Sequence, residues 1–182
     1  MKIIVGLGNP GEKYKHTRHN VGWLALDWLI ETLGGKVENF RLEKHLNAQL
    51  LDLTDTDRVL WVKPQTFMNA SGEPVKQLCD FYKLNPHTDV LILHDEIDLP
   101  LGKVKFTGSA SSAGHNGVAD IINHLGTQDF HRLRIGVETR LTKTELPTEV
   151  FVLQNFTNEE LQKLTSDIFP NIKSITETFI HN

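Results

Sequence analysis

The sequence predicts an α/β fold, because strand-like and helix-like segments alternate along it. Residues 2–8 and 89–93 are short apolar runs typical of buried strands, and the first is β-branched at three positions. Residues 20–33 and 116–125 have the spacing of helices with apolar faces. The length of 182 residues suits one compact domain. We therefore expect residues 1–182 to form a single α/β domain.

The first strand ends in a glycine-rich turn, Gly6-Leu7-Gly8-Asn9-Pro10-Gly11, which also fits the pattern G-x-G-x-x-G. A dinucleotide site with this pattern needs a helix to begin inside it. Pro10 removes one backbone N–H and moves Asn9 away from helical angles, and the next helix begins about eight residues later. The turn therefore does not predict a dinucleotide site, but it places Asn9 at the end of a strand.

The helix expected over 20–33 begins next to His19. Thr17 or Asn20 can cap it, and Gly34-Gly35 can end it. The positive end of a helix disfavours an imidazolium, so His19 is expected to be neutral, which is the form that a general base needs. The alternative is a structural histidine that only caps the helix or packs beside it.

A hairpin is predicted next, with strands at 46–54 and 58–63 and a turn at 55–57. The second strand leads into Phe67, Met68 and Asn69. Asn69 or Ser71 is expected to cap a helix that ends at Asn85-Pro86. Phe67 and Met68 are candidates for a binding surface, and the alternative for both is core filling.

The strand at 89–93 ends in a polar run, His94-Asp95-Glu96-Ile97-Asp98. In α/β proteins, ligands bind at the carboxyl ends of strands. Asn9, the loop 67–69 and Asp95 are therefore expected to surround one crevice. A metal site is not predicted here, because neighbouring strand residues point to opposite faces and no recognised ligand spacing is present.

The second half of the chain continues the alternation. Lys103 and Lys105 share one face of a strand at 103–107, and a loop of small residues, 108–114, precedes the helix at 116–125, which Asn116 is expected to cap. A further strand is expected at 131–137, then a short apolar run at 150–153 and a last helix. That helix begins with the capping box Thr157-Asn158-Glu159-Glu160 and is broken or kinked at Pro170.

Composition narrows the class of protein. The chain has a formal net charge of −4 and one cysteine, which excludes an intrachain disulfide and a cysteine-based zinc site. It has no apolar run long enough to span a membrane and no signal peptide, so we expect a cytoplasmic protein. Six Lys and Arg residues stand against three acids between residues 101 and 143. This bias is either a solvated surface or a patch for an anionic ligand.

Six motifs in order resemble those of the bacterial peptidyl-tRNA hydrolase family. Each is weak alone, but together they cover residues 3 to about 137. They are Gly6-Leu7-Gly8-Asn9-Pro10-Gly11 with Tyr14, Thr17-Arg18-His19-Asn20, Thr66-Phe67-Met68-Asn69 with Ser71-Gly72, His94-Asp95-Glu96-Ile97-Asp98-Leu99-Pro100-Leu101-Gly102, Gly114-His115-Asn116-Gly117 and His131-Arg132-Leu133-Arg134-Ile135-Gly136.

The resemblance implies a twisted mixed β-sheet sandwiched by helices in a monomer without an obligate protein partner. It implies an esterase that separates the peptide from tRNA with no cofactor and no metal. His19 would be the general base, Asp95 its partner, and Asn9 the residue that distinguishes blocked from free aminoacyl groups. The contacts to the end of peptidyl-tRNA would be Tyr14, Phe67, Asn69 and Asn116, with Met68 and His115 as secondary crevice residues.

Chemistry at these positions agrees with the resemblance. A neutral histidine can take a proton from water, and a carboxylate on its other ring nitrogen stabilises the imidazolium that forms. Lys103, Lys105 and Arg134 would hold tRNA phosphates, which gives affinity without sequence choice. Arg140 and Lys143 are further candidates for RNA contacts.

The chain departs from the family pattern at Ser109-Ala110-Ser111-Ser112-Ala113, where relatives usually carry a glycine-rich run. Added Cβ atoms restrict the backbone of this loop. Two other functions remain open. One is a catalytically idle RNA-binding relative of the same fold, as in the plant organelle splicing-factor branch, and the other is a metal-dependent hydrolase.

Overall fold

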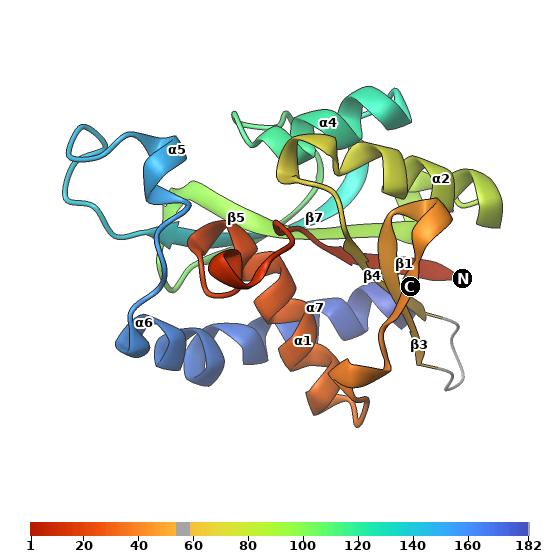
Figure 1. Cartoon of the computed structure of the whole chain (residues 1–182), viewed down its shortest axis with the longest axis horizontal. Helices are drawn as coiled ribbons and strands as arrows, with labels where there is room; N and C mark the ends of the chain where they lie inside the picture. Colours follow the sequence, from red (N-terminus) through yellow and green to blue (C-terminus); the bar gives the residue numbers. More distant parts are fainter. Residues whose placement is uncertain (54–58, 182) are drawn as a thin grey trace.

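The computed structural model describes residues 1–53 and 59–181, and its centre is a seven-stranded mixed sheet (Figure 1). The strand order is β2-β3-β4-β1-β5-β7-β6. The four central strands run parallel, whereas β2 and β3 at one edge and β6 at the other are antiparallel to their neighbours. The strands are β1 (Lys2–Gly6), β2 (Arg41–Glu43), β3 (Ala48–Leu53), β4 (Val59–Pro64), β5 (Val90–Pro100), β6 (Val104–Ser109) and β7 (Asp129–Glu138).

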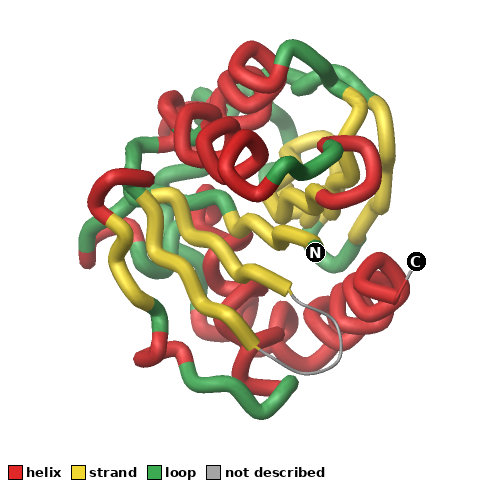
Figure 2. Tube along the Cα trace, turned by 90° about the vertical axis from the view of Figure 1, so that its right-hand side faces the viewer, coloured by secondary structure: helices red, strands yellow, loops and turns green. Residues whose placement is uncertain are grey.

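Helices cover both faces of the sheet. One face carries α1 (Val21–Thr32) and α7 (Phe169–His181), and the other carries α2 (Gly72–Tyr82) and α4 (Asn116–Leu125) (Figures 1 and 2). The short helices are α3 (Pro86–Asp89), α5 (Thr148–Phe151) and α6 (Asn158–Lys163). This arrangement confirms the predicted α/β fold with a mixed sheet sandwiched by helices. Of the described residues, no helix combines the length and apolar character needed to cross a membrane.

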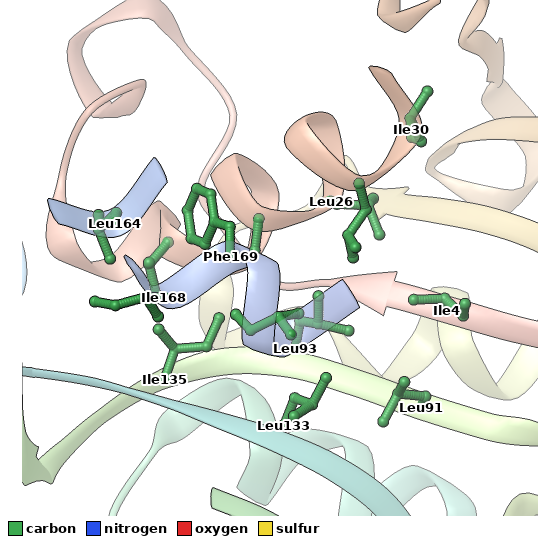
Figure 3. Close-up of a cluster of buried hydrophobic side chains, with 14 of the residues drawn as sticks. Ile4, Leu26, Ile30, Leu91, Leu93, Leu133, Ile135, Leu164, Ile168 and Phe169 are labelled. Atoms are coloured by element: carbon green, nitrogen blue, oxygen red, sulfur yellow. The ribbon is translucent and has the colours of Figure 1, made fainter. Parts of the chain in front are cut away.

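Each face of the sheet has its own apolar core. Ile4 of β1 points toward α1 and α7, where it joins Leu26, Leu93 and Phe169 (Figure 3). Its neighbours Ile3 and Val5 point to the other face, under α2 and α4, because side chains alternate along a strand. β1 and the first part of β5 are therefore apolar on both faces, which explains why residues 2–8 and 89–93 show no polar alternation.

Several boundaries differ from those predicted. β5 runs to Pro100 rather than ending at residue 93, so Asp95 lies within the strand. The short strand β2 and helix α3 were not predicted. The turn expected at 55–57 lies outside the described residues. The capping box at Thr157 is confirmed, and a π-helical turn at 164–168 precedes Pro170, which stands in the first turn of α7.

Three predicted helix caps are wrong, because the polar side chains have other partners. Asn20 makes no cap bond to α1 and instead accepts the backbone N–H of Asn9. Neither Asn69 nor Ser71 caps α2, whose first N–H, that of Gly72, is accepted by the carboxylate of Asp120. His115, not Asn116, caps α4.

Gly22 lets α1 lie directly against the end of β1. A Cβ atom at this position would stand 2.7 Å from the backbone nitrogen of Leu7 and would also meet the carbonyl oxygen of Leu93. We expect Gly22→Ala to lower the free energy of unfolding by about 3 kcal/mol, because backbone atoms cannot give way as a side chain can. Chemical denaturation measures the loss.

Gly108→Ala is the matched control, since a Cβ there meets only a ring atom of His131 at 3.9 Å. Equal stability of the two variants would contradict the close approach of α1 to the sheet.

Candidate active site

Three buried side chains meet just beyond the end of β1. The last pairing of β1 joins Gly6 to Leu93, so Asp95 lies two residues past the point where its neighbour strand stops. The Asp95 carboxylate is 3% exposed, and one of its oxygens, Oδ1, lies 2.8 Å from His19 Nδ1 and 2.8 Å from His115 Nε2. His19 lies in the turn before α1, and His115 caps α4. The helical layers of both faces thus each supply one histidine to a single carboxylate.

The hydrogen bonds fix the tautomers of both histidines. Nδ1 of His115 accepts the backbone N–H of Val118 at 3.2 Å, so Nε2 must carry the proton that is donated to Asp95. His19 donates its Nδ1–H to the same carboxylate oxygen, which leaves Nε2 as the nitrogen with a free lone pair. The backbone N–H of His19 donates to the carbonyl of Val152 at 2.8 Å, so both the backbone and the ring of His19 are fixed. His19 is therefore oriented as a base.

The electrostatics of the cluster oppose burial. Burial lowers the pKa of His19, but the charge of Asp95 and the hydrogen bond to it together raise that pKa above its ordinary value of 6.5. Burial alone would raise the pKa of the Asp95 carboxyl, yet the two histidines hold it well below its ordinary value, so Asp95 is ionised at neutral pH. This raised pKa contradicts the expectation that the position of His19 disfavours the imidazolium, because the Asp95 charge and hydrogen bond outweigh burial.

The cluster of His19, Asp95 and His115 has the donor types of a metal site, with one ligand atom from each residue within 4.8 Å of the others. Binding would need a lone pair on Nε2 of His115, and hence a proton on Nδ1. That proton would face the Val118 N–H, and two donors would oppose each other. The hydrogen bonds therefore favour a proton-transfer site over a metal site.

Asn9 borders the same site with its carboxamide fixed. Its Oδ1 accepts the backbone N–H of Met68 at 2.8 Å, and its backbone is paired twice with the side chain of Asn20 at 2.9 and 3.0 Å. The NH₂ group of Asn9 has no partner among the described residues. Because Oδ1 is held by the Met68 N–H, the unpaired NH₂ group is the part of Asn9 that can donate to a ligand.

Two hollows meet at His19. The larger, of about 380 Å³, is lined by Asp95, Glu96, Ile97, Ala113, Gly114 and His115. The smaller, of about 260 Å³, is lined by Asn9, Phe67, Met68, Asn69 and Leu153. Four residues, His19, Asn116, Glu149 and Val152, line both. The predicted crevice around Asn9, the loop 67–69 and Asp95 is therefore present, with His19 between its two halves.

The predicted contact residues take different places around this crevice. Phe67 is 58% exposed, so it is not core filling, whereas Met68 is 4% exposed, packs in the core under α2 and α4 and also lines the smaller hollow. Tyr14 lines neither hollow, but its ring meets that of Phe67 edge-on, with centroids 6.5 Å apart. An exposed aromatic surface next to His19 suits the stacking of a planar group.

The basic residues predicted to hold phosphates differ in their exposure and in their ion-pair partners. Lys103 and Lys105 are exposed, and Lys105 stands directly opposite Arg134 across β6 and β7. Arg134 is already bound to the buried carboxylate of Glu96 at 2.7 Å. Of the further candidates, Arg140 is bound to Glu138, and Lys143 is bound to Asp98. Lys103 and Lys105 are thus the more available cations.

Sequence reasoning missed three contributors to the site. Asn20 was taken as a helix cap, but it positions Asn9. Glu149 and Val152 line both hollows from α5 and the residue after it. No pattern pointed to the last two, because they belong to a region without a clear period, and backbone bonds from His19 to Val152 and from Arg18 to Gln154 bring that region to the site.

Comparisons with known proteins point to one family. The family model described as peptidyl-tRNA hydrolase matches residues 3–182. A peptidyl-tRNA hydrolase of Lactobacillus helveticus is 41% identical over 180 residues, covering 99% of this chain and 93% of the relative. One from Exiguobacterium sibiricum is 44% identical over 172 residues, covering 92% and 89%. The crystal structure of the peptidyl-tRNA hydrolase of Acinetobacter baumannii superimposes with a TM-score of 0.79 at 29% identity and covers 99% of this chain and 94% of that one.

Proposed function

This chain belongs to the peptidyl-tRNA hydrolase family, and on that premise we propose that His19 is the general base of its reaction. The enzyme hydrolyses the ester bond between tRNA and a peptide or N-blocked aminoacyl group, so that the tRNA is recycled. The observation that carries the role of His19 is its place between the two hollows, with Nδ1 bound to Asp95 and the lone pair of Nε2 free.

The reaction follows from this geometry. Nε2 of His19 takes a proton from a water molecule while the oxygen of that water attacks the acyl carbon of the ester. The imidazolium that forms is stabilised by the ionised Asp95 carboxylate on Nδ1. The carbon–oxygen bond to the 3′ oxygen of tRNA then breaks, and the imidazolium returns a proton to that oxygen. The products are a free peptide acid and a tRNA with a free 3′ hydroxyl.

Asn9 selects the substrate through its NH₂ group. This donor can bind the carbonyl of an N-blocked aminoacyl group or peptide, whereas a free aminoacyl group has an ammonium there instead. A donor cannot bind an ammonium, and the Met68 N–H occupies one of the two lone pairs of Asn9 Oδ1. Loss of a hydrogen-bond partner in a buried polar site discriminates strongly.

The remaining contacts follow the shape of the crevice. Phe67 stacks on a planar part of the substrate, with Tyr14 behind it, and Asn69 and Asn116 bind its polar groups. Met68 and His115 shape the floor and the wall. We further propose that residues 1–182 act as one catalytic domain, as a cytoplasmic monomer without cofactor, metal or obligate protein partner.

The decisive assay uses tRNA carrying an N-acetylated aminoacyl group beside the same tRNA with a free amino group, both in excess EDTA. We expect rapid release of the blocked group alone. Cleavage of neither substrate, with tRNA still bound, would favour the idle RNA-binding relative. Activity that EDTA abolishes would favour a metal-dependent hydrolase.

The pH dependence of kcat/KM tests the state of His19. Only the neutral imidazole accepts a proton, and its pKa is raised above 6.5 by Asp95. We therefore expect kcat/KM to rise with pH and to reach half of its plateau above pH 6.5. A midpoint below 6.5 would contradict the dominance of the Asp95 charge over burial.

Lys105→Ala tests the phosphate contacts. The exposed ammonium of Lys105 has no ion-pair partner among the described residues, so it is free for a phosphate. We expect weaker tRNA binding and a salt dependence, as log Kd against log salt, that is shallower by about one. Lys173→Ala is the control, since that lysine lies on α7 and pairs with Glu177. An unchanged slope would exclude Lys105 from the contacts.

A further inference from the structure

Arg132 of β7 carries a buried charge that serves neither the sheet nor the reaction directly. It is 1% exposed and lies over the ring of Phe130, 5.0 Å from its centroid. In the described part of the chain, no carboxylate forms an ion pair with it, and the nearby Glu96 is bound to Arg134 instead. Burying a guanidinium without such a partner costs free energy, so its hydrogen bonds indicate its role.

Those hydrogen bonds go to one loop. Nη1 of Arg132 donates to the carbonyl of Ser111 at 2.9 Å, and Nη2 donates to the carbonyl of Ala110. No other side chain from outside residues 110–114 bonds to these residues, among those that the structure describes. The guanidinium therefore holds two successive carbonyls of the loop with its fork of donors.

The loop leads straight to the active site. Ala113 and Gly114 line the larger hollow, and the next residue, His115, donates to Asp95. Ala113 and Gly114 both have positive φ, 49° and 83°, and the turn is closed by the His115 N–H on the carbonyl of Ser112. A left-handed conformation is unfavourable for a residue with a Cβ atom, so Ala113 needs an external constraint to keep it.

We propose that Arg132 is a positioning residue that holds the loop 110–114 so that His115 reaches Asp95. Without this tether, Ala113 relaxes and His115 moves away from the carboxylate. Among the described residues, the Asp95 carboxylate then has His19 as its only imidazole partner, since His94 bonds to the backbone carbonyl of Asp95, and the Asp95 charge acts on His19 more strongly. The kinetic consequences rest on the proposed function, whereas the consequences for the two histidines do not.

Arg132→Met tests the tether, because methionine fills the space without a donor. We expect kcat/KM to fall on the order of tenfold, less than the ~100-fold that a 1 Å misplacement can cost. The midpoint of the pH profile should move to higher pH, as it should in His115→Ala, and the double variant should shift no further than His115→Ala alone. Arg132→Lys, which can reach one carbonyl, should be intermediate.

Thr107→Val is the matched control. Thr107 stands opposite Arg132 in the register of β6 and β7, and its buried hydroxyl has no hydrogen-bond partner in the described part of the chain. This variant disturbs the same place without touching the loop and should keep the wild-type midpoint. A fall in rate for Arg132→Met with an unmoved midpoint would be a general structural effect and would overturn the proposal.

Nitrogen NMR of ¹⁵N-histidine-labelled protein separates this proposal from the proposed function. In the wild type, His115 should show a proton on Nε2 and an unprotonated Nδ1, and Arg132→Met should lose this single tautomer while Thr107→Val keeps it. That result would support the tether even in a chain that cleaves no ester. An unchanged His115 signal in Arg132→Met would overturn the tether, whatever the activity.

Discussion

His19→Ala is expected to lower kcat by a factor of about 10³, within the range that a general base contributes. The lost group is Nε2 of His19, whose lone pair is free and whose ring is oriented by the Asp95 carboxylate. Binding should survive, because the backbone N–H of residue 19 still donates to the carbonyl of Val152. Single-turnover cleavage of N-acetyl-aminoacyl-tRNA, with the Kd for deacylated tRNA beside it, measures both effects.

His16→Ala is the control for this variant, since His16 is exposed in the same loop. Added imidazole should restore part of the activity of His19→Ala, because truncation leaves room for a free base next to Asp95. Full activity of His19→Ala would end the assignment of His19. A loss of tRNA binding equal to the loss of turnover would show that His19 acts in binding and not as the base.

The fold could be predicted from sequence wherever one local pattern decided the outcome. β1 and residues 90–93 of β5 are apolar on both faces, and helix α4 has the i, i+3, i+4 spacing, so each of these elements is defined by its own residues. The extent of β5 was not predictable in this way. Residues 94–100 are mostly polar and end in proline, and within them residues 94–96 and Pro100 pair with β7 across a register shift.

The site divides along the same line. His19, Asp95 and Asn9 could be found because their types, at a helix start and at strand ends, suit acid–base chemistry. The hydrogen bonds among the site residues could not be predicted, since the bond from His115 to Asp95 joins residues on different elements and depends on how α4 meets β5. The pKa of His19 was misjudged for this reason: the helix terminus is local and visible in the sequence, whereas the carboxylate that raises the pKa is 76 residues away.

Asp95→Asn is expected to lower kcat by a factor of about 10² to 10³ and to leave KM nearly unchanged. An asparagine oxygen can still accept the two imidazole N–H groups, so the shape of the site is kept, but the charge that stabilises the imidazolium is lost. A comparable Asp→Asn change in a serine protease triad costs about 10⁴. Steady-state kinetics on the blocked substrate measure the split between kcat and KM.

The pH profile of Asp95→Asn gives the stronger test. Burial lowers the pKa of His19 and the Asp95 charge raises it, so removing the charge leaves burial unopposed. The midpoint of kcat/KM should therefore move to lower pH, opposite to the shift expected for Arg132→Met. Asp98→Asn, at an exposed position bound to Lys143, should move neither the rate nor the midpoint. If Asp95→Asn kept the wild-type rate and midpoint, His19 would be acting without a carboxylate partner, and the pairing on which the mechanism depends would be wrong.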